Sequence, residues 1–151
     1  MHGRPLSTRS GAVRGDTRLI RVFDPAREGV ALPMISRQAR LVAWPGAGAR
    51  QAQMNYVILE PHESNVPHRH DRSEDTIFVV EGQGIVSNVD SGTVHPVEAG
   101  CIVHVPAGVG HAVTAVTRMI SVGGPCPPDE AMLKRSGWLP AREEGSSWTS
   151  D

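Results

Sequence analysis

Residues 67–82 read PHRHDRSEDTIFVVEG and carry the strongest structural signal in the chain. His68 and His70 stand two positions apart, and an extended chain points the side chains of residues i and i+2 to the same face. Two imidazoles on one face can converge on a single ion, and a carboxylate four or five positions later can turn back onto the same point. The run Thr76–Glu81 that follows is rich in β-branched residues and ends at Gly82. The stretch therefore predicts a β-strand that starts beside a metal site.

A second segment, GCIVHVPAGVGH at residues 100–111, supplies a further histidine. Gly100 and the turn at Pro106–Gly108 bracket one short strand, and His111 opens the next. Around these segments short apolar runs alternate with turn residues. Strands are expected at 38–44, 51–59, 76–81, 85–88, 93–97, 102–105 and 112–116, the last continuing into 118–122. Short strands at regular spacing predict an all-β sandwich or barrel.

The two ends of the chain differ from this centre. Residues 1–17 are rich in Gly, Ser and Arg and residues 141–151 are polar, so both are expected to be flexible arms around one domain at 18–140. Residues 19–23 are expected to form a short strand that pairs with a second subunit. Residues 128–136 have the acidic start and basic end of a helix.

Taken together, the two segments resemble the paired motifs of the cupin superfamily, H-x-H-x(3,4)-E-x6-G and G-x5-P-x-G-x2-H-x3-N. The resemblance extends over about residues 38–122. Ala115 stands in place of the final Asn, which is not a metal ligand in the family. The positions that match are His68, His70, Gly82, Gly100, Pro106, Gly108 and His111.

This resemblance implies an all-β double-stranded β-helix, the jelly-roll barrel of cupins, with a short N-terminal strand extension and a minor C-terminal helix or lid. It also implies a metal held by His68, His70 and His111. The main departure is the family's glutamate ligand, because this chain has Asp75 seven positions before Gly82. Strand alternation favours Asp75, but three arrangements are open. Asp75 binds after a small strand shift, Glu74 binds through a β-bulge, or three histidines bind with the acid behind them.

Three neutral imidazoles with at most one carboxylate suit one divalent transition metal: Fe, Mn, Ni, Zn or Cu. Four protein ligands leave two positions of an octahedral ion for water, O₂ or a chelating substrate. A purely structural site would instead use four Cys or His ligands. Cys101 and Cys126 lack C-x-x-C spacing and are expected to be reduced thiols.

Further residues are candidates for roles around the metal. Glu74 and His104 are candidate catalytic proton shuttles, because a carboxylate or an imidazole beside the site suits proton transfer. Gln53 and Asn55 belong to a polar stripe that would ordinarily face solvent but can line the cavity of a small barrel. They are candidate substrate-binding residues, as is Arg118, which could pair with a substrate carboxylate.

Composition limits the partners. With 15 basic and 16 acidic residues the formal charge is −1, which argues against nucleic acid or an acidic membrane as the main partner. No apolar run approaches the roughly 20 residues that span a bilayer, and no secretory signal follows the N-terminal arginines. A cytoplasmic location is expected.

The resemblance implies a metal-dependent enzyme that acts on a small oxygenated or carboxylated molecule. A dioxygenase or a redox-neutral lyase, cyclase, isomerase or decarboxylase fits equally, in a setting such as natural-product tailoring. The alternative is a non-catalytic, metal-dependent ligand-binding or sensor cupin. A homodimer is expected, because open sheet edges need pairing.

Overall fold

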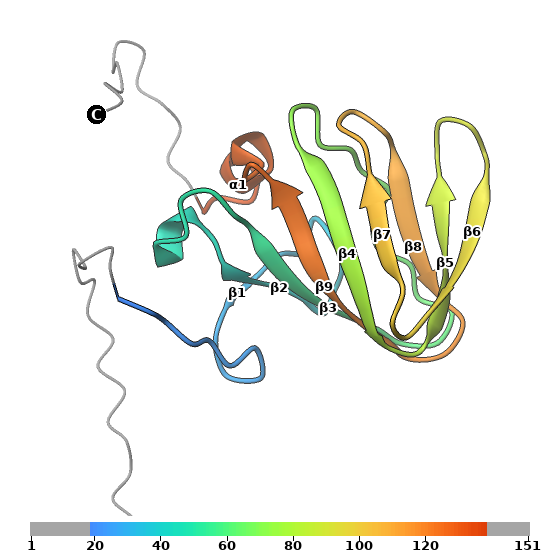
Figure 1. Ribbon diagram of the computed structural model, residues 1–151, viewed down its shortest axis with the longest axis horizontal. Coiled ribbons are helices and arrows are strands. Elements are labelled where there is room, and N and C mark those ends of the chain that lie inside the picture. The colour runs from blue at the N-terminus through green and yellow to red at the C-terminus, as the bar shows by residue number, and fades with distance from the viewer. Residues whose placement is uncertain (1–18, 139–151) are drawn as a thin grey trace, which may run out of the picture.

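The chain folds into two β-sheets that face one another, with a short helix beside the larger sheet (Figure 1). The computed structural model describes residues 19–138. The larger sheet has the strand order β1-β2-β3-β9-β4-β7, and the smaller sheet has the order β6-β5-β8. The strands are β1 (Val30–Ala31), β2 (Ala39–Ala43), β3 (Met54–Leu59), β4 (Glu74–Glu81), β5 (Gln83–Asn88), β6 (Val94–Glu98), β7 (Ile102–Val105), β8 (His111–Ala115) and β9 (Met119–Cys126). A 3-10 helix, η1 (Pro45–Ala47), follows β2, and α1 (Glu130–Arg135) follows β9.

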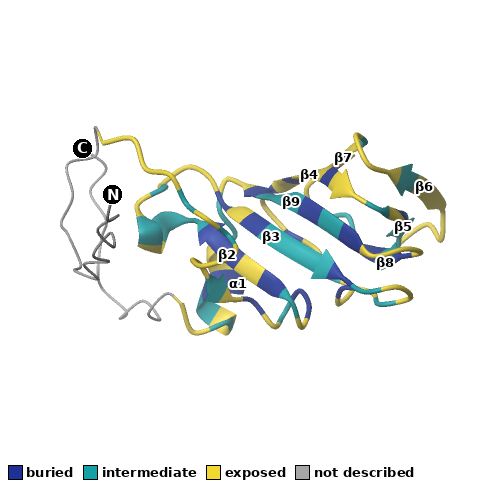
Figure 2. Ribbon diagram, turned by 90° about the horizontal axis from the view of Figure 1, so that it is seen from below, coloured by how far each residue is buried: buried dark blue, intermediate teal, exposed yellow. Residues whose placement is uncertain are grey.

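Apolar side chains fill the space between the two sheets. The buried positions on the strands of both sheets are dark blue in Figure 2. Successive residues of a strand point to opposite faces, so every second residue of the central strands enters this core. Burying one such Val, Leu or Met side chain is worth about 1.5–3 kcal/mol relative to leaving it exposed. The buried cluster consists of Leu59, Val79 and Met119 from the larger sheet and Val86, Val113 and Ala115 from the smaller one. This core holds the two sheets together and so fixes the strands that carry the site residues.

Gly82 is the point where the chain leaves the larger sheet and enters the smaller one, between β4 and β5. Its φ is +86°, and a Cβ at this position would lie 2.0 Å from the carbonyl oxygen of Arg118. Only glycine combines that backbone conformation with so close an approach. The geometry explains why a glycine follows the strand of the first motif at a fixed distance.

The predicted strands correspond to strands of the structure with small shifts at their ends, and the prediction at 102–105 coincides with β7. The prediction of one continuous strand through 112–122 was wrong. β8 pairs with β5 in the smaller sheet, whereas β9 pairs with β3 and β4 in the larger. The turn at 116–118 carries the chain across the barrel.

Residues 19–23 form no strand within the single chain, and their Leu19, Ile20 and Val22 side chains are exposed, so the pairing of this segment with a second subunit stays a prediction. The first described strand is β1 instead. The predicted flexible arms at 1–17 and 141–151 lie outside the described residues.

The predicted helix at 128–136 is α1, and it is fixed at both ends. At its start the Asp129 side chain accepts a hydrogen bond from the backbone N–H of Met132 at 3.0 Å, as an N-cap does. Met132 is buried against Leu32, Ile35 and Ala39. Within the described residues, no helix is long and apolar enough to cross a membrane.

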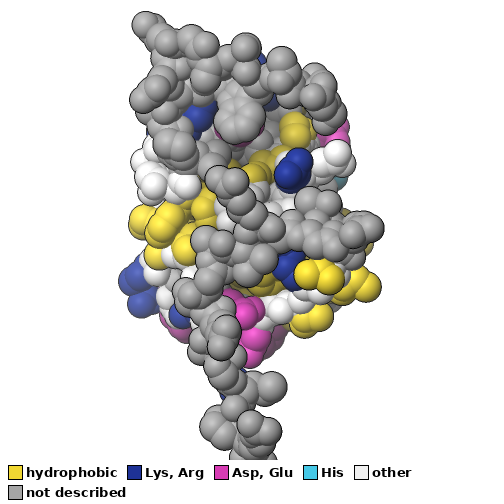
Figure 3. Space-filling view, turned by 90° about the vertical axis from the view of Figure 1, so that its left-hand side faces the viewer, with side chains coloured by type: hydrophobic (Ala, Val, Ile, Leu, Met, Phe, Trp, Pro, Cys, Tyr) yellow, Lys and Arg dark blue, Asp and Glu magenta, His cyan; other side chains and the backbone are white. Residues whose placement is uncertain are grey.

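Beyond α1, Trp138 contacts β1, the edge strand of the larger sheet. Its indole N–H donates to the carbonyl oxygen of Ala31 at 2.9 Å, and its ring lies 6.4 Å from that of Trp44, measured between centroids. Figure 3 looks at the molecule from the left-hand side of Figure 1, and hydrophobic and basic side chains both reach the surface there.

Candidate metal centre

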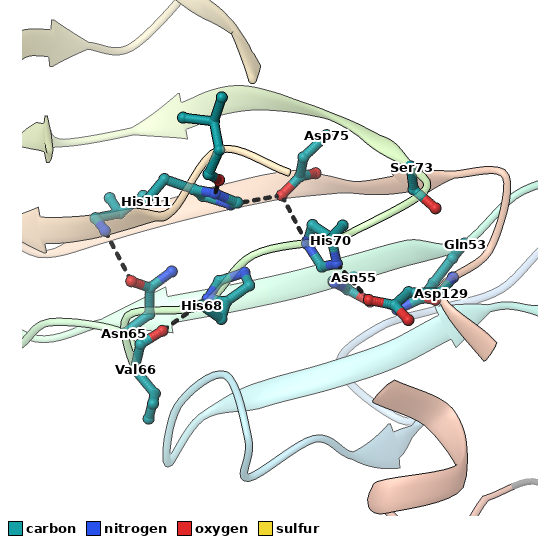
Figure 4. Close-up of polar contacts among 12 residues, drawn as sticks. Gln53, Asn55, Asn65, Val66, His68, His70, Ser73, Asp75, His111 and Asp129 are labelled. Atoms are coloured by element: carbon teal, nitrogen blue, oxygen red, sulfur yellow. Dashed lines mark hydrogen bonds and ion pairs between the residues drawn. The ribbon is translucent and has the colours of Figure 1, made fainter. Parts of the chain in front are cut away.

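Three segments bring side chains to one point between the sheets (Figure 4). His68 and His70 lie on the extended segment before β4, Asp75 is the second residue of β4, and His111 is the first residue of β8. An isolated β-bridge joins His68 to His111. The backbone N–H of each donates to the carbonyl oxygen of the other, at 3.1 and 2.9 Å. This bridge holds two histidines from distant parts of the sequence side by side.

The four side chains form a compact cluster. Each offers one ligand atom, and these atoms lie within 4.8 Å of one another. The centroids of the three imidazole rings are 4.5, 5.0 and 5.6 Å apart. Oδ2 of Asp75 lies 3.1 Å from Nε2 of His111 and 3.4 Å from Nε2 of His70. His70, Asp75 and His111 are buried, whereas His68 is partly exposed.

The orientation of each ring is set by a hydrogen bond at Nδ1. Nδ1–H of His68 donates to the Val66 carbonyl at 2.7 Å, and Nδ1–H of His111 donates to the Val109 carbonyl at 2.9 Å. A carbonyl oxygen can only accept, so the proton sits on Nδ1 and Nε2 keeps its lone pair. Nε2 of His111 faces the Asp75 carboxylate (Figure 4). Such support behind the ring is the usual arrangement of metal-bound histidines.

Two buried polar atoms in the cluster have no hydrogen-bond partner among the described residues: Nε2 of His70 and Oδ1 of Asp75. An unsatisfied buried polar atom costs about 1–3 kcal/mol. A cation placed among these atoms would accept their lone pairs. Three imidazole nitrogens and one carboxylate oxygen form a donor set that suits a divalent transition metal. The residues present therefore fit the metal that the sequence predicts.

The charges of the metal-free cluster are strongly perturbed. Burial acts to raise the pKa of the Asp75 carboxyl, but the close contacts with the His111 and His70 imidazoles outweigh it and hold that pKa below its usual range. For His70, burial acts to lower the pKa, but the contacts with Asp129 and Asp75 outweigh it and raise the pKa to about 9. Burial lowers the pKa of His68 to about 4, with the neighbouring imidazoles adding to the effect. The cluster thus holds an ionised carboxylate next to one charged and one neutral imidazole.

Asp129 is a site residue that the sequence analysis missed. Its Oδ2 accepts a hydrogen bond from Nδ1–H of His70 at 2.7 Å, while its Oδ1 caps α1. The signal that could have found it is its place as an N-cap, just after the Pro127-Pro128 pair. That signal predicts a helix start but does not reveal a partner 59 residues away.

Gln53 and Asn55 face the interior, so the polar stripe of β3 and its preceding residue points inward rather than to solvent. Nε2 of Gln53 donates to Oδ1 of Asn55 at 3.2 Å, and Oε1 of Gln53 accepts from the backbone N–H of Asp129 at 3.2 Å. Gln53 therefore supports Asp129. Asn55 lines a small inner cavity of about 30 Å³ together with His68 and Asp75.

The structure brings Asp75 into the cluster and leaves Glu74 outside. Asp75, Ile77 and Val79 share the inner face of β4, so Glu74 projects to the outer face. His104 pairs in register with Thr76 and also points outward, and its Nε2 lies 3.5 Å from Oε2 of Glu74. Both side chains are more than half exposed. The outward orientation of Glu74 contradicts the prediction that it is an alternative ligand. The outward orientation of Glu74 and His104 also contradicts the prediction that they shuttle protons at the metal.

Arg118 also lies away from the cluster, which corrects its prediction as a substrate-binding residue. Its guanidinium lies 3.6 Å from Glu60 and 3.7 Å from Glu81. Glu81 ends β4, six positions after Asp75, so the two positions are about 20 Å apart along the strand, at roughly 3.3 Å per residue. Arg118 belongs to the opposite end of the barrel.

Comparison with known proteins gives a consistent result. A sequence model of the cupin domain matches residues 55–123. No curated protein matches the chain at a significant level.

Solved structures with the same fold include a Cupin 2 conserved barrel domain protein from Salinispora arenicola CNS-205, which is 24% identical, with a TM-score of 0.51 over 79% of this chain and 95% of that one. An uncharacterized conserved protein with a double-stranded β-helix domain from Klebsiella pneumoniae is 17% identical, with a TM-score of 0.58 over 74% and 93%. KdgF from a Halomonas species is 20% identical, with a TM-score of 0.55 over 73% and 96%. Residues 55–123 thus match the model of the cupin domain, and the chain has the double-stranded β-helix fold of these solved structures.

Proposed function

We propose that this protein is a metal-dependent enzyme that acts on a small oxygenated or carboxylated molecule. The observation that carries the proposal is the cluster of three imidazoles and one carboxylate, with ligand atoms within 4.8 Å of one another. Buried polar atoms without partners at its centre, among the residues that the structure describes, support the same interpretation. The cupin fold by itself supports many activities, so the proposal rests on this site.

A divalent ion held by His68, His70, Asp75 and His111 would supply a Lewis acid or a centre that activates O₂. The protein's part is to fix the ligands. The backbone carbonyls of Val66 and Val109 orient two of the rings, and the Asp129 carboxylate orients the third. The low pKa of Asp75 keeps its carboxylate ionised at neutral pH, ready to bind a cation without first losing a proton.

The inner cavity limits what can reach the interior of the site. Its volume of about 30 Å³ leaves room for one or two molecules the size of water. Apolar side chains such as Val57, Leu59 and Ile77 line it, together with the polar Asn55 and Ser121. A reacting group of a few atoms, or a small gas such as O₂, fits this space, while the rest of a larger substrate must lie outside it.

Two reaction classes fit this description: a dioxygenase, and a redox-neutral lyase, cyclase, isomerase or decarboxylase, in a role such as natural-product tailoring. The second candidate function is a non-catalytic, metal-dependent ligand-binding or sensor protein. One observation favours it. Among the described residues that line the inner cavity, the ionisable ones are His68 and Asp75, both in the ligand set. Within that described lining, no separate general acid or base faces the space.

The test uses full-length protein that is stripped with a chelator and reloaded separately with Fe(II), Mn(II), Ni(II), Zn(II) or Cu(II). Each form is incubated with small carboxylic and hydroxylated compounds, and O₂ uptake in air and products under argon are measured. We expect turnover with at least one metal, lost in His68→Ala and retained in His104→Ala, which removes an exposed histidine of the outer face. Turnover under argon with zinc would exclude the oxygenase class. Saturable ligand binding with no turnover would contradict the enzyme and support the sensor.

A further inference from the structure

A second hollow lies next to the metal centre and is lined by a different set of residues from the inner cavity. It has a volume of about 670 Å³, within the range of about 300–1,000 Å³ that small-molecule sites occupy. Three segments form its walls: the region around η1, the loop between the metal-centre histidines and β4, and the run at 127–135 that contains α1. Five basic side chains line it: Arg50, Arg69, Arg72, Lys134 and Arg135. We call this hollow the basic cleft.

The basic cleft and the inner cavity lie on opposite sides of His70. Nε2 of His70 faces Asp75, which lines the inner cavity, while Nδ1 faces Asp129, which lines the basic cleft. A molecule in the basic cleft would therefore lie behind the ring of His70. The basic cleft is a separate site, and it does not depend on what the metal centre does.

Much of the positive charge in the basic cleft is not matched by acidic side chains among residues 19–138. Arg69 is fixed by Asp90 at 2.9 Å and by the Gly108 carbonyl at 3.0 Å. The other four basic side chains form no ion pair with any residue from 19 to 138 within 4 Å. Three acidic residues also line the basic cleft, and one of them, Asp129, is engaged by His70 and by the helix cap.

The other two acidic residues of the lining are Asp71 and Glu130. Counted over the whole lining, five basic and three acidic side chains leave a local excess of two positive charges, in a chain whose formal charge is −1. A cleft lined by an excess of one sign focuses its field and attracts ions of the opposite sign. The guanidinium groups of Arg50, Arg72 and Arg135 also match the geometry of carboxylate and phosphate oxygens.

We propose that the basic cleft binds a small molecule that carries two or more negative charges, such as a phosphoryl, sulfate or dicarboxylate group. The negative charge of this molecule would be neutralised jointly by Arg50, which follows η1, by Arg72 of the loop before β4, and by Lys134 and Arg135 of α1. Binding would link α1 to the loop that carries His70. Exposed charges are screened by salt, so the affinity should fall as ionic strength rises.

The experiment is a titration of ¹⁵N-labelled, zinc-loaded, full-length protein with inorganic phosphate, sulfate or succinate, followed by amide chemical shifts. Acetate at equal ionic strength is the singly charged reference. We expect at least one of the three dianions to give saturable shifts at Arg50, Ser73 and Lys134 and to bind about tenfold or more tightly than acetate. The anion that binds best identifies the chemical group.

The variant Arg50→Gln/Lys134→Gln removes two positive charges from the basic cleft and should weaken dianion binding by about tenfold or more. The matched control Arg27→Gln/Arg37→Gln removes two exposed charges elsewhere, beside Asp24 and Glu63, and should bind as the wild type does. Circular dichroism checks that both variants are folded.

His68→Ala separates this proposal from the metal centre. Binding retained in His68→Ala supports a basic cleft that acts independently, and binding lost would place the anion on the metal and overturn the proposal. Shifts that do not saturate, or that are equal in both double variants, would show an adventitious ion only and would also overturn it.

Discussion

At the scale of single residues, the metal centre depends on atoms outside the ligand set. Asp129 does two things with its two oxygens: one accepts from His70 and the other caps α1. The ring of His70 is buried and has a carboxylate at each nitrogen, at 2.7 and 3.4 Å. Its orientation therefore depends on a side chain that lies 59 positions later in the sequence.

We predict that Asp129→Asn weakens metal binding by about 10–100-fold, the usual effect of losing a partner behind a metal-bound histidine. Asparagine is as good an N-cap as aspartate, so α1 should stay formed. Competition with a fluorescent chelator gives the metal affinity. Glu130→Gln, one residue further along and exposed, is the matched control and should bind metal as the wild type does. Equal affinities in both variants would mean that Asp129 has no role at the metal.

The pKa values of the metal-free protein predict a stability maximum near pH 6.5. The pKa of His70 is raised to about 9, so its contribution is complete below pH 6.5 and is lost as pH rises through 9. The full loss is on the order of 3 kcal/mol at 1.36 kcal/mol per pKa unit. The pKa of His68 is lowered to about 4, so the folded state resists a proton that the unfolded chain accepts, and stability also falls as pH drops from 6.5 toward 4.

Urea unfolding of chelator-treated protein between pH 5 and 9 measures the free energy of unfolding on both sides of pH 6.5. His70→Gln should reduce the loss of stability between pH 6.5 and 9. His95→Gln, which replaces an exposed histidine of β6, should leave that loss unchanged. A stability that keeps rising from pH 6.5 to 9 would contradict a charged His70 in the metal-free cluster.

At the scale of elements, the sequence predicted most of the strands and the convergence of the three histidines. The motif spacing was sufficient because His68 and His70 share one face of an extended segment, and glycines fix where each strand ends. Alternation along β4 also favoured Asp75 over Glu74, and the structure agrees. What local patterns could not show is which sheet each strand joins, so the turn between β8 and β9 was missed.

The inward polar stripe shows the same limit. Polar residues in alternation normally face water, but Gln53 is buried because its amide joins Asn55 to the backbone of Asp129. The contact between Gln53 and Asp129, which are 76 positions apart in the sequence, overrides the local pattern. The candidate role of His104 as a proton shuttle fails for a related reason, since the outward orientation of its side chain follows from its register with Thr76.

We predict that Leu133→Ala, in α1, destabilises the protein by about 2–5 kcal/mol, the usual cost of a buried leucine. Leu133 is fully buried, whereas its neighbour Glu130 is exposed. Thermal unfolding of the metal-loaded protein compares Leu133→Ala with Glu130→Ala, which should change stability little. A loss below about 1 kcal/mol in Leu133→Ala would show that α1 contributes little to the packed core.

At the scale of the whole molecule, the outer face of the larger sheet is unusually apolar. Tyr56, Val122, Phe78 and Ile102 pair in register across β3, β9, β4 and β7 and so point to the same side. Phe78 and Ile102 are 42% and 71% exposed. Exposed apolar patches of this kind mark interaction surfaces. We propose that a second copy of the chain covers this face in a homodimer.

Light scattering at micromolar concentration tests the dimer. The wild type should have twice the mass of one chain, and Ile102→Asp should have the mass of one. Val94→Asp changes a valine of the smaller sheet that is also more than half exposed, at 60%, and should stay dimeric. A wild-type protein with the mass of a single chain would contradict the proposed interface.

The proposed chemistry requires that His68, His70, Asp75 and His111 hold one ion together. Elemental analysis of full-length protein purified without chelator, and again after reloading, measures metal per chain. We predict about one ion per chain in the wild type and in His95→Ala, and a loss of most of it in His111→Ala, because His111 contributes one of the three converging imidazoles. A wild type that takes up no metal, or a His111→Ala variant that holds as much as His95→Ala, would contradict this metal centre.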